Sequence, residues 1–232
     1  MSEISHAAHA TPLEPPRRRP GRALARRIGI AVLLIVAVWL GLGLYSASGA
    51  RRVFLVPLDA DPRFLRLLRE YYQRELGLDL AVLPEVVLTD DAWDPAREQF
   101  VAQRLTELIY RKYWRLRWPS RSLVIGVTSR DMYIEGVSWS FAFSVRHQER
   151  IGVASYARMD PEFLGDPPNE DLLTTRLRKI VSRDIAFMGY HLAPSDDPRS
   201  LLYRNVLGLE ELDALEENLV AAGLPVSANA PR

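Results

Sequence analysis

Apolar and polar positions follow two different periods along residues 53–222 of this chain. Short apolar or alternating runs predict strands, whereas apolar positions three and four residues apart predict helices with one buried face. Strands are predicted at residues 53–57, 80–83, 122–128, 139–145 and 150–155, and helices at residues 62–76, 94–109, 170–188 and 209–222. The order β-α-β-α-β-β-β-α-loop-α predicts an α/β domain in which helices pack on a mixed β-sheet.

Pro and Gly mark several of the predicted helix ends. Pro62 opens the first helix, and Asp94 followed by Pro95 predicts the start of the second, because the carboxylate can accept backbone N–H bonds where proline needs none. Gly223 and Pro225 predict the end of the last helix.

A long segment without any charge precedes this domain. Residues 28–45, which start at Ile28 and end at Tyr45, would span about 27 Å as a helix, enough to cross a lipid bilayer. Six arginines between residues 17 and 27 precede the segment and only Arg51 and Arg52 closely follow it, so the positive-inside rule places the amino terminus in the cytoplasm. We therefore expect a single-pass protein of the cell (inner) membrane, with an extracytoplasmic or periplasmic domain.

A cleaved signal peptide is the alternative, because Ser48, Gly49 and Ala50 offer small side chains for processing. The apolar segment is longer than an ordinary signal core, which favours an uncleaved anchor. The predicted organisation is a disordered basic cytoplasmic tail (1–27), a transmembrane helix (28–45), a short linker (46–52), the α/β domain (53–222) and a disordered tail (223–232).

The net charge also differs between the amino-terminal segment and the rest of the chain. The chain has 30 Lys and Arg against 29 Asp and Glu, but residues 1–52 carry a net charge of +6 and the remainder −5. A mildly acidic body does not indicate a nucleic-acid partner. The chain has no cysteine, which excludes disulfides, thiol nucleophiles and cysteine-based zinc sites.

Residues 110–121 combine five basic and four aromatic side chains without an acid. Tryptophan favours the membrane interface and arginine is attracted to anionic head groups, so this stretch predicts a contact with the membrane surface. The expected contact residues are Arg111, Lys112, Trp114, Arg115, Arg117 and Trp118. The alternatives are that the aromatic rings pack on the core while the charges reach water, or that the stretch docks another protein.

Five segments of the domain, in order, resemble blocks of the archaemetzincins, zinc metallopeptidases of the metzincin group. They are VFLVPL (53–58), AWDPAREQFVAQRLTELI (92–109), VIGVTSRDMY (124–133), ERIGVASYARM (149–159) and SLLYRNVLGLEELD (200–213). The resemblance implies a metzincin-like fold with a zinc-binding helix. It also implies that the family motif H-E-x-x-H-x-x-G-x-x-H falls on residues 183–193.

The motif is degenerate in this chain. The resemblance places Arg183, Phe187 and Ala193 at the three zinc-binding histidines. It places Asp184 at the glutamate and Tyr190 at the glycine of the motif. Beyond the apolar segment the chain has only His147 and His191, so three histidines cannot meet in one chain. We therefore expect no cofactor and a pseudopeptidase that binds a peptide or a protein without cutting it.

Two further expectations concern the site. In metzincins an edge strand binds extended peptides, and the resemblance implies this role for Ser138, Trp139, Ser140, Phe141, Ala142, Phe143 and Ser144. The alternative to a pseudopeptidase is an active membrane-bound hydrolase with a centre rebuilt around Asp184 and His191, joined by Asp196 or Asp197; only then is zinc expected.

Overall fold

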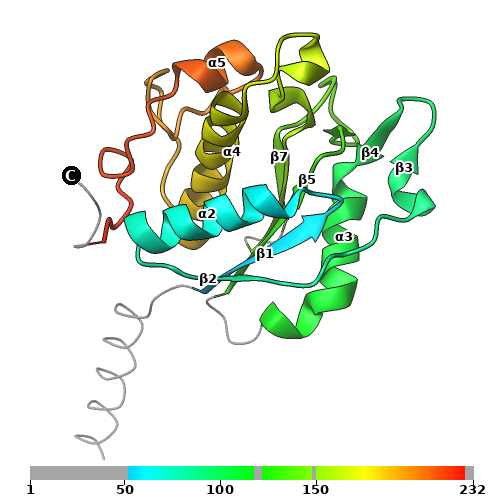
Figure 1. Cartoon of the computed structure of the whole chain (residues 1–232), viewed down its shortest axis with the longest axis horizontal. Coiled ribbons are helices and arrows are strands. Elements are labelled where there is room, and N and C mark those ends of the chain that lie inside the picture. The colour runs from blue at the N-terminus through cyan, green and yellow to red at the C-terminus, as the bar shows by residue number, and fades with distance from the viewer. Residues whose placement is uncertain (1–51, 118–121, 148–149, 228–232) are drawn as a thin grey trace, which may run out of the picture. The chain divides into compact units, whose positions relative to one another are not determined.

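The computed structural model describes residues 52–117, 122–147 and 150–227. Its centre is a five-stranded sheet in the order β2-β1-β5-β8-β7 (Figure 1). The first four strands are parallel and β7 is antiparallel to β8 at one end of the sheet. The strands are β1 (Arg52–Leu58), β2 (Asp79–Val82), β5 (Leu123–Thr128), β7 (Ser144–His147) and β8 (Ile151–Ser155).

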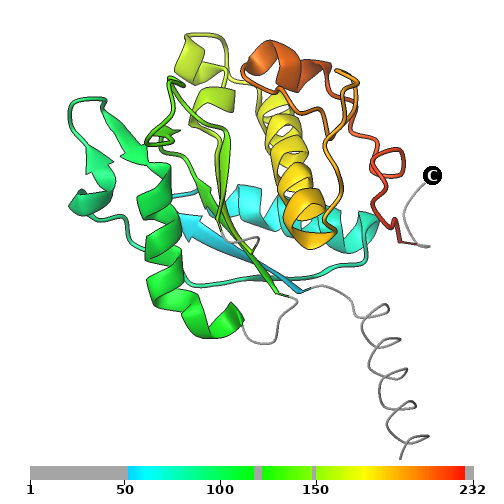
Figure 2. The same ribbon diagram turned by 180° about the vertical axis from the view of Figure 1, so that it is seen from behind.

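Helices cover both faces of this sheet. The helices α2 (Pro62–Glu75) and α4 (Glu170–Asp184) lie on one face and α3 (Ala102–Tyr113) lies on the other (Figures 1 and 2). The helix α4 continues as a π-helical turn (Ile185–Gly189), and α5 (Leu209–Ala214) follows later. Short 3₁₀ turns occupy Asp90–Ala92, Trp114–Arg117, Ala157–Met159 and Glu162–Leu164.

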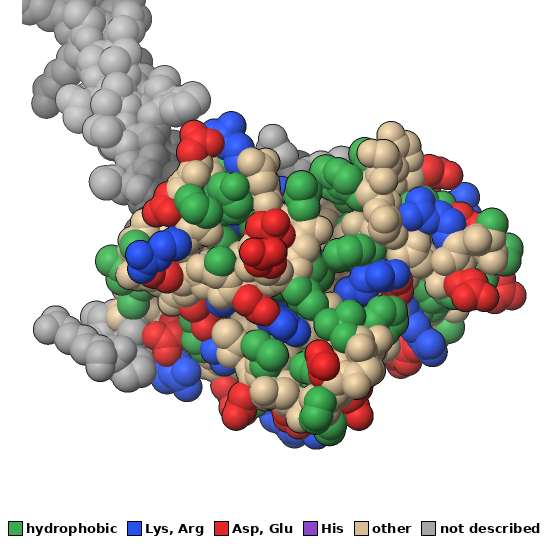
Figure 3. Space-filling model, turned by 90° about the horizontal axis from the view of Figure 1, so that it is seen from above, with side chains coloured by type: hydrophobic (Ala, Val, Ile, Leu, Met, Phe, Trp, Pro, Cys, Tyr) green, Lys and Arg blue, Asp and Glu red, His purple; other side chains and the backbone are tan. Residues whose placement is uncertain are grey.

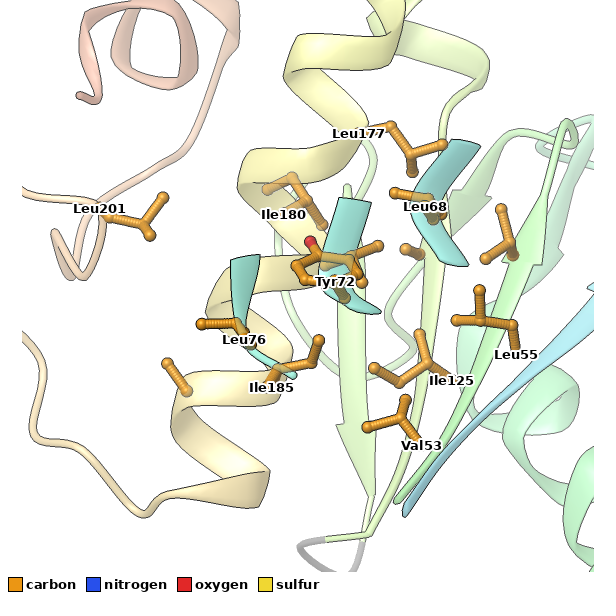
Figure 4. Packing of buried hydrophobic residues seen from close by; sticks show 14 of the residues in the cluster. Val53, Leu55, Leu68, Tyr72, Leu76, Ile125, Leu177, Ile180, Ile185 and Leu201 are labelled. Atoms are coloured by element: carbon orange, nitrogen blue, oxygen red, sulfur yellow. The ribbon is translucent and has the colours of Figure 1, made fainter. Parts of the chain in front are cut away.

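The alternation of β1 explains the two cores. Val53 and Leu55 point to the side of α2 and α4, whereas Phe54 and Val56 point to the side of α3. In the first core, Tyr72 of α2 is fully buried against α4 (Figure 4). Its hydroxyl donates to the Arg178 carbonyl at 2.8 Å and lies 2.9 Å from Ser182 Oγ.

The helix predicted at residues 94–109 is wrong in its first half. Residues Trp93–Asp94 (β3) and Gln99–Val101 (β4) form an antiparallel pair, β6 (Met132–Tyr133) joins β4, and α3 begins only at Ala102. The Asp94 carboxylate does accept a backbone bond, from Ala96 N at 2.9 Å, but it closes a turn and not a helix. Tyr133 fixes this turn by donating to Asp94 Oδ2 at 2.7 Å.

The strand predicted at residues 139–145 is also corrected. Residues 138–143 are irregular and β7 starts at Ser144. The carbonyls of Trp139 and Ser140, which a strand would offer to its neighbour, instead accept hydrogen bonds from the side chains of Arg97 and Gln99.

The helix predicted at residues 170–188 is confirmed, since α4 and its π-helical turn together run from Glu170 to Gly189. The last predicted helix is too long, because α5 ends at Ala214 rather than at residue 222. The chain leaves the α5 helix because Lys179 Nζ donates to the carbonyls of Leu212 and Asp213, and Glu216 N donates to Arg199 O. These partners replace the bonds that a longer helix would have made.

The ends of the predicted domain also change. Residues 223–227, predicted as part of a disordered tail, pack on the body: Leu224 is buried and Ser227 N donates to Glu75 O at 2.7 Å. Within the described ranges no helix is long and apolar enough to cross a membrane. The predicted anchor at 28–45 and the tails at 1–27 and 228–232 lie outside those ranges.

Candidate functional site

A groove of about 450 Å³ opens beside the edge strand β7. It is lined by residues 138–144, Arg146, Ile180, Arg183 and residues 204–207. All seven residues that the sequence assigned to a peptide-binding strand therefore line one cavity, although most of them are loop and not strand. The groove brings them to the second half of α4, where the resemblance places the family motif.

The loop wall of this groove is held by buried polar side chains. Gln99 is almost fully buried and donates to both Asp131 Oδ2 and the Ser140 carbonyl, at 2.9 and 3.0 Å. Arg158 forms a bidentate pair with Asp131 and places its guanidinium 4.9 Å from the centre of the Phe141 ring. The loop is thus fixed although it has no regular hydrogen-bond ladder.

The free edge of β7 faces away from the sheet. Ser155 N donates to the Phe143 carbonyl, so Phe143 and Val145 direct their backbone groups to β8. By the alternation of an antiparallel pair, the N–H and C=O groups of Ser144 and Arg146 point to the outer edge. Both residues also line the groove.

Arg183 stands where the resemblance implies the first zinc-binding histidine. Its side chain comes from α4 and is only 7% exposed, and its Nη1 donates to the Leu201 carbonyl at 2.6 Å. Burial, together with the neighbouring charge of Arg146 and against the opposing charge of Asp184, lowers the pKa of Arg183 to about 10. At neutral pH the guanidinium is therefore a positive charge in the floor of the groove.

Asp184, where the resemblance implies the family's glutamate, is fully buried. Its Oδ1 accepts a hydrogen bond from Ser144 Oγ at 3.2 Å and lies 3.6 Å from Arg146 Nη1. Its Oδ2 has no hydrogen-bond partner among the described residues. Burial raises the pKa of Asp184 to about 7, because desolvation outweighs the two arginines and the Ser144 hydroxyl.

Phe187, where the resemblance implies the second zinc-binding histidine, contacts two cations. The guanidinium of Arg146 lies 4.5 Å from the centre of its ring, and that of Arg183 lies 5.5 Å away. Each distance suits a cation–π contact. The ring is half-buried and packs against the main core.

Tyr190, Ala193 and His191 differ from Asp184 in burial. Tyr190 is half-buried and packs against the main core, whereas His191 and Ala193 are exposed. His191 has a left-handed backbone, with φ of 53°, and follows Tyr190 at the end of the π-helical turn. Asp196 and Asp197 are also exposed. A centre rebuilt around Asp184 and His191 would therefore combine one buried carboxyl group with exposed side chains.

The basic and aromatic stretch at residues 110–121 is only partly described. Lys112 Nζ donates to the Glu85 carbonyl at 2.6 Å and Arg111 pairs with Glu107. Trp114 is 54% exposed, with the Arg115 guanidinium 5.3 Å from the centre of its ring. Trp118 and the side chain of Arg117 lie outside the described residues, so the membrane contact stays a prediction.

A larger cavity of about 540 Å³ lies at the carboxyl ends of β1 and β5. Its charged lining includes Asp59 and Arg130, which pair with each other at 2.5 Å. This cavity also contains the acidic residues Glu85 and Asp90, and it holds none of the residues that the sequence assigned to a site.

Sequence reasoning missed several residues of the groove. Arg146 and Arg204 were not singled out, nor were residues 205–207. Arg146 follows the predicted strand by one position, which was a signal for its place beside the groove. Arg204 reaches the groove through a loop fixed by tertiary bonds, such as the one from Arg204 N to the Ser195 carbonyl, and had no local signal.

The fold and the groove define an α/β domain with a cavity beside the edge strand of a mixed sheet. No family model matches the chain. The archaemetzincin of Methanocaldococcus jannaschii is 26% identical over 136 residues, which cover 58% of this chain and 70% of that protein. The chain is thus archaemetzincin-like, as its sequence segments predicted.

Solved structures show the same fold. The archaemetzincin of Methanopyrus kandleri matches with a TM-score of 0.57 and 22% identity, covering 74% of this chain and 90% of that one. A zinc-dependent peptidase of Methanocorpusculum labreanum matches with a TM-score of 0.59 and 17% identity, covering 72% and 94%. The predicted mixed α/β fold with packed helices is confirmed.

These comparisons correct the expectation that no cofactor belongs to this protein, because zinc dependence is stated for a structural neighbour. The residues at the position that the resemblance implies, however, do not fit that ion. Arg183, Phe187 and Ala193 carry no side-chain group that binds zinc at neutral pH. In the described part of the chain no three His, Cys, Asp or Glu side chains gather where they could hold a metal.

Proposed function

We propose that this domain is a catalytically degenerate peptidase relative that binds an extended peptide or protein segment along the free edge of β7. The observation that carries the proposal is the outward backbone of Ser144 and Arg146, which opens into a groove lined by residues 138–144. An added strand gains backbone hydrogen bonds at such an edge and places alternate side chains in the neighbouring pocket.

The lining of the groove suits this role. Trp139 is 49% exposed and Leu207 is 60% exposed, so both present apolar surface that a bound segment would cover. Catalytic degeneracy is supported by the motif itself, because Arg183 and Phe187 occupy two of the positions that the family's mechanism assigns to histidine.

We also propose that the uncharged segment 28–45 anchors the protein in the cell membrane, with the groove outside the cytoplasm. The arginine excess before this segment supports that orientation. The binding partner would then be an extracytoplasmic or membrane-bound protein, reached within a few residues of the bilayer surface.

A proline substitution tests the mode of binding. Ser144→Pro removes one outward N–H group without removing a bond to β8, and Ser144→Ala is the matched control that removes the hydroxyl but keeps the N–H. With the full-length chain in detergent and a library of labelled hexapeptides, we expect Ser144→Pro to weaken binding at least tenfold and Ser144→Ala to bind like the parent. Fluorescence anisotropy measures both, and circular dichroism checks that each variant is folded.

Two results would overturn the proposal. One is equal peptide binding by Ser144→Pro and Ser144→Ala. The other is stoichiometric zinc by elemental analysis together with peptide cleavage that is lost on Asp184→Ala, which would establish an active hydrolase.

A further inference from the structure

Every charged side chain that lines the groove is an arginine. Arg146 comes from β7, Arg183 from α4 and Arg204 from the loop before α5, and no Asp or Glu lines the same cavity. The body of the protein beyond residue 52 has a net charge of −5, and one face of it shows basic and acidic side chains interspersed with hydrophobic ones (Figure 3). The all-basic lining is therefore a property of the groove and not of the surface in general.

The acids that face these arginines do not neutralise them. Arg204 pairs with Asp196 at 2.7 Å, but that carboxylate is 81% exposed and the pair is screened by water. Asp184 is the acid beside Arg146 and Arg183, and a single carboxylate balances at most one of these two cations.

Arg146 and Arg183 also repel each other. Both guanidinium groups contact the ring of Phe187, and each charge disfavours the other. Two guanidinium groups that are held together against their repulsion are preorganised for an anion. A bound negative charge relieves the repulsion, and the arginine side chains need no further ordering to hold it.

The rest of the groove indicates what carries the anion. Trp139 and Leu207 expose apolar surface and β7 exposes backbone groups, a combination that a small inorganic anion would leave unused. We infer that the groove recognises a carboxylate on its bound peptide, held by Arg146, Arg183 and Arg204. This inference rests on the proposed peptide binding, and the carboxylate has two sources: an acidic side chain or the free carboxyl terminus.

Matched peptides separate these sources. One arm compares amidated hexapeptides that differ only by Glu or Gln at a single position, and the other compares neutral hexapeptides with free and amidated carboxyl termini. With the full-length chain in detergent, we expect loss of the recognised carboxylate to raise the dissociation constant about tenfold or more, as for a charge-assisted hydrogen bond. The arm that shows the loss identifies the source.

Arginine variants connect the effect to the groove. Arg146→Gln and Arg204→Gln, whose side chains are 41% and 52% exposed, should each weaken binding of the carboxylate peptide about tenfold and leave the neutral peptide unchanged. Arg104→Gln is the control, because this arginine of α3 is similarly exposed, at 43%, and does not line the groove. Arg183 is not substituted, since its buried bond to Leu201 also supports the fold.

The outcomes are distinct. If neutral and carboxylate peptides bind equally, or if both arginine variants bind the carboxylate peptide like the parent, the inference is wrong while peptide binding stands. If no peptide of either arm binds, the proposed function fails and the inference fails with it.

Discussion

The surroundings of Asp184 change the pKa of its side chain. The resemblance implies a catalytic glutamate at this position, and Asp184 is fully buried with one oxygen atom unpartnered among the described residues. Arg146, Arg183 and Ser144 favour its charged form, and burial outweighs them, so its pKa is raised to about 7. Because the pKa of this carboxyl group differs between the folded and unfolded chain, the free energy of unfolding depends on pH.

The sign of that dependence follows from the raised pKa. Between about pH 4 and pH 7 the folded chain keeps a proton on Asp184 that the unfolded chain has lost, so the free energy of unfolding falls as the pH rises. The slope from this group is about 1.4 kcal/mol per pH unit, and it vanishes above pH 7. Asp184→Asn should lack it.

Urea unfolding of the parent and Asp184→Asn at pH 4.5, 5.5, 6.5 and 7.5 measures this effect. The variant is the reference for all other titrating groups, because the parent and the variant both contain them. A difference in unfolding free energy that is constant across the four pH values would contradict the burial of a protonated Asp184.

At the scale of elements, α2 and α4 are joined by one buried polar contact within an apolar core. The Tyr72 hydroxyl binds the Arg178 carbonyl and Ser182 Oγ, and both Tyr72 and Ser182 are fully buried. This contact fixes how α4 lies on the sheet and therefore where Arg183 meets the groove.

Removing either hydroxyl of this contact should lower the free energy of unfolding, because the remaining hydroxyl is left buried without its partner. Tyr72→Phe and Ser182→Ala should each lower the free energy of unfolding by about 1–2 kcal/mol, since each leaves a buried polar atom without its partner. The double variant should cost less than the two added together, by about 1 kcal/mol. Chemical denaturation of the four proteins measures this coupling, and strict additivity would argue against a bond between the two hydroxyls.

The elements that the sequence predicted best are those whose pattern matches their burial. The four parallel strands and α2 were placed within one or two residues, because apolar runs and a proline at Pro62 are local signals. Residues 94–101 and 138–143 failed because side chains from elsewhere, such as Tyr133 and Arg97, take the backbone or capping groups that the local pattern needed.

At the scale of the whole molecule, the distribution of arginine around residues 28–45 predicts an orientation across the membrane. Alkaline phosphatase, which is active only outside the cytoplasm, should be active when fused after Arg232. It should be inactive when fused after Arg27, before the apolar segment. Activity of the second fusion and not of the first would reverse the proposed topology.

The sequence by itself determined the α/β class, the family resemblance and the presence of only two histidines beyond residue 52, since each depends on residue identity and local order. Only the tertiary structure decided that residues 138–144, Arg146, Arg183 and Arg204 share one groove. The physical reason is that this groove is made by side chains far apart in the chain, whose positions depend on packing and on long-range hydrogen bonds. The burial that raises the pKa of Asp184 has the same origin.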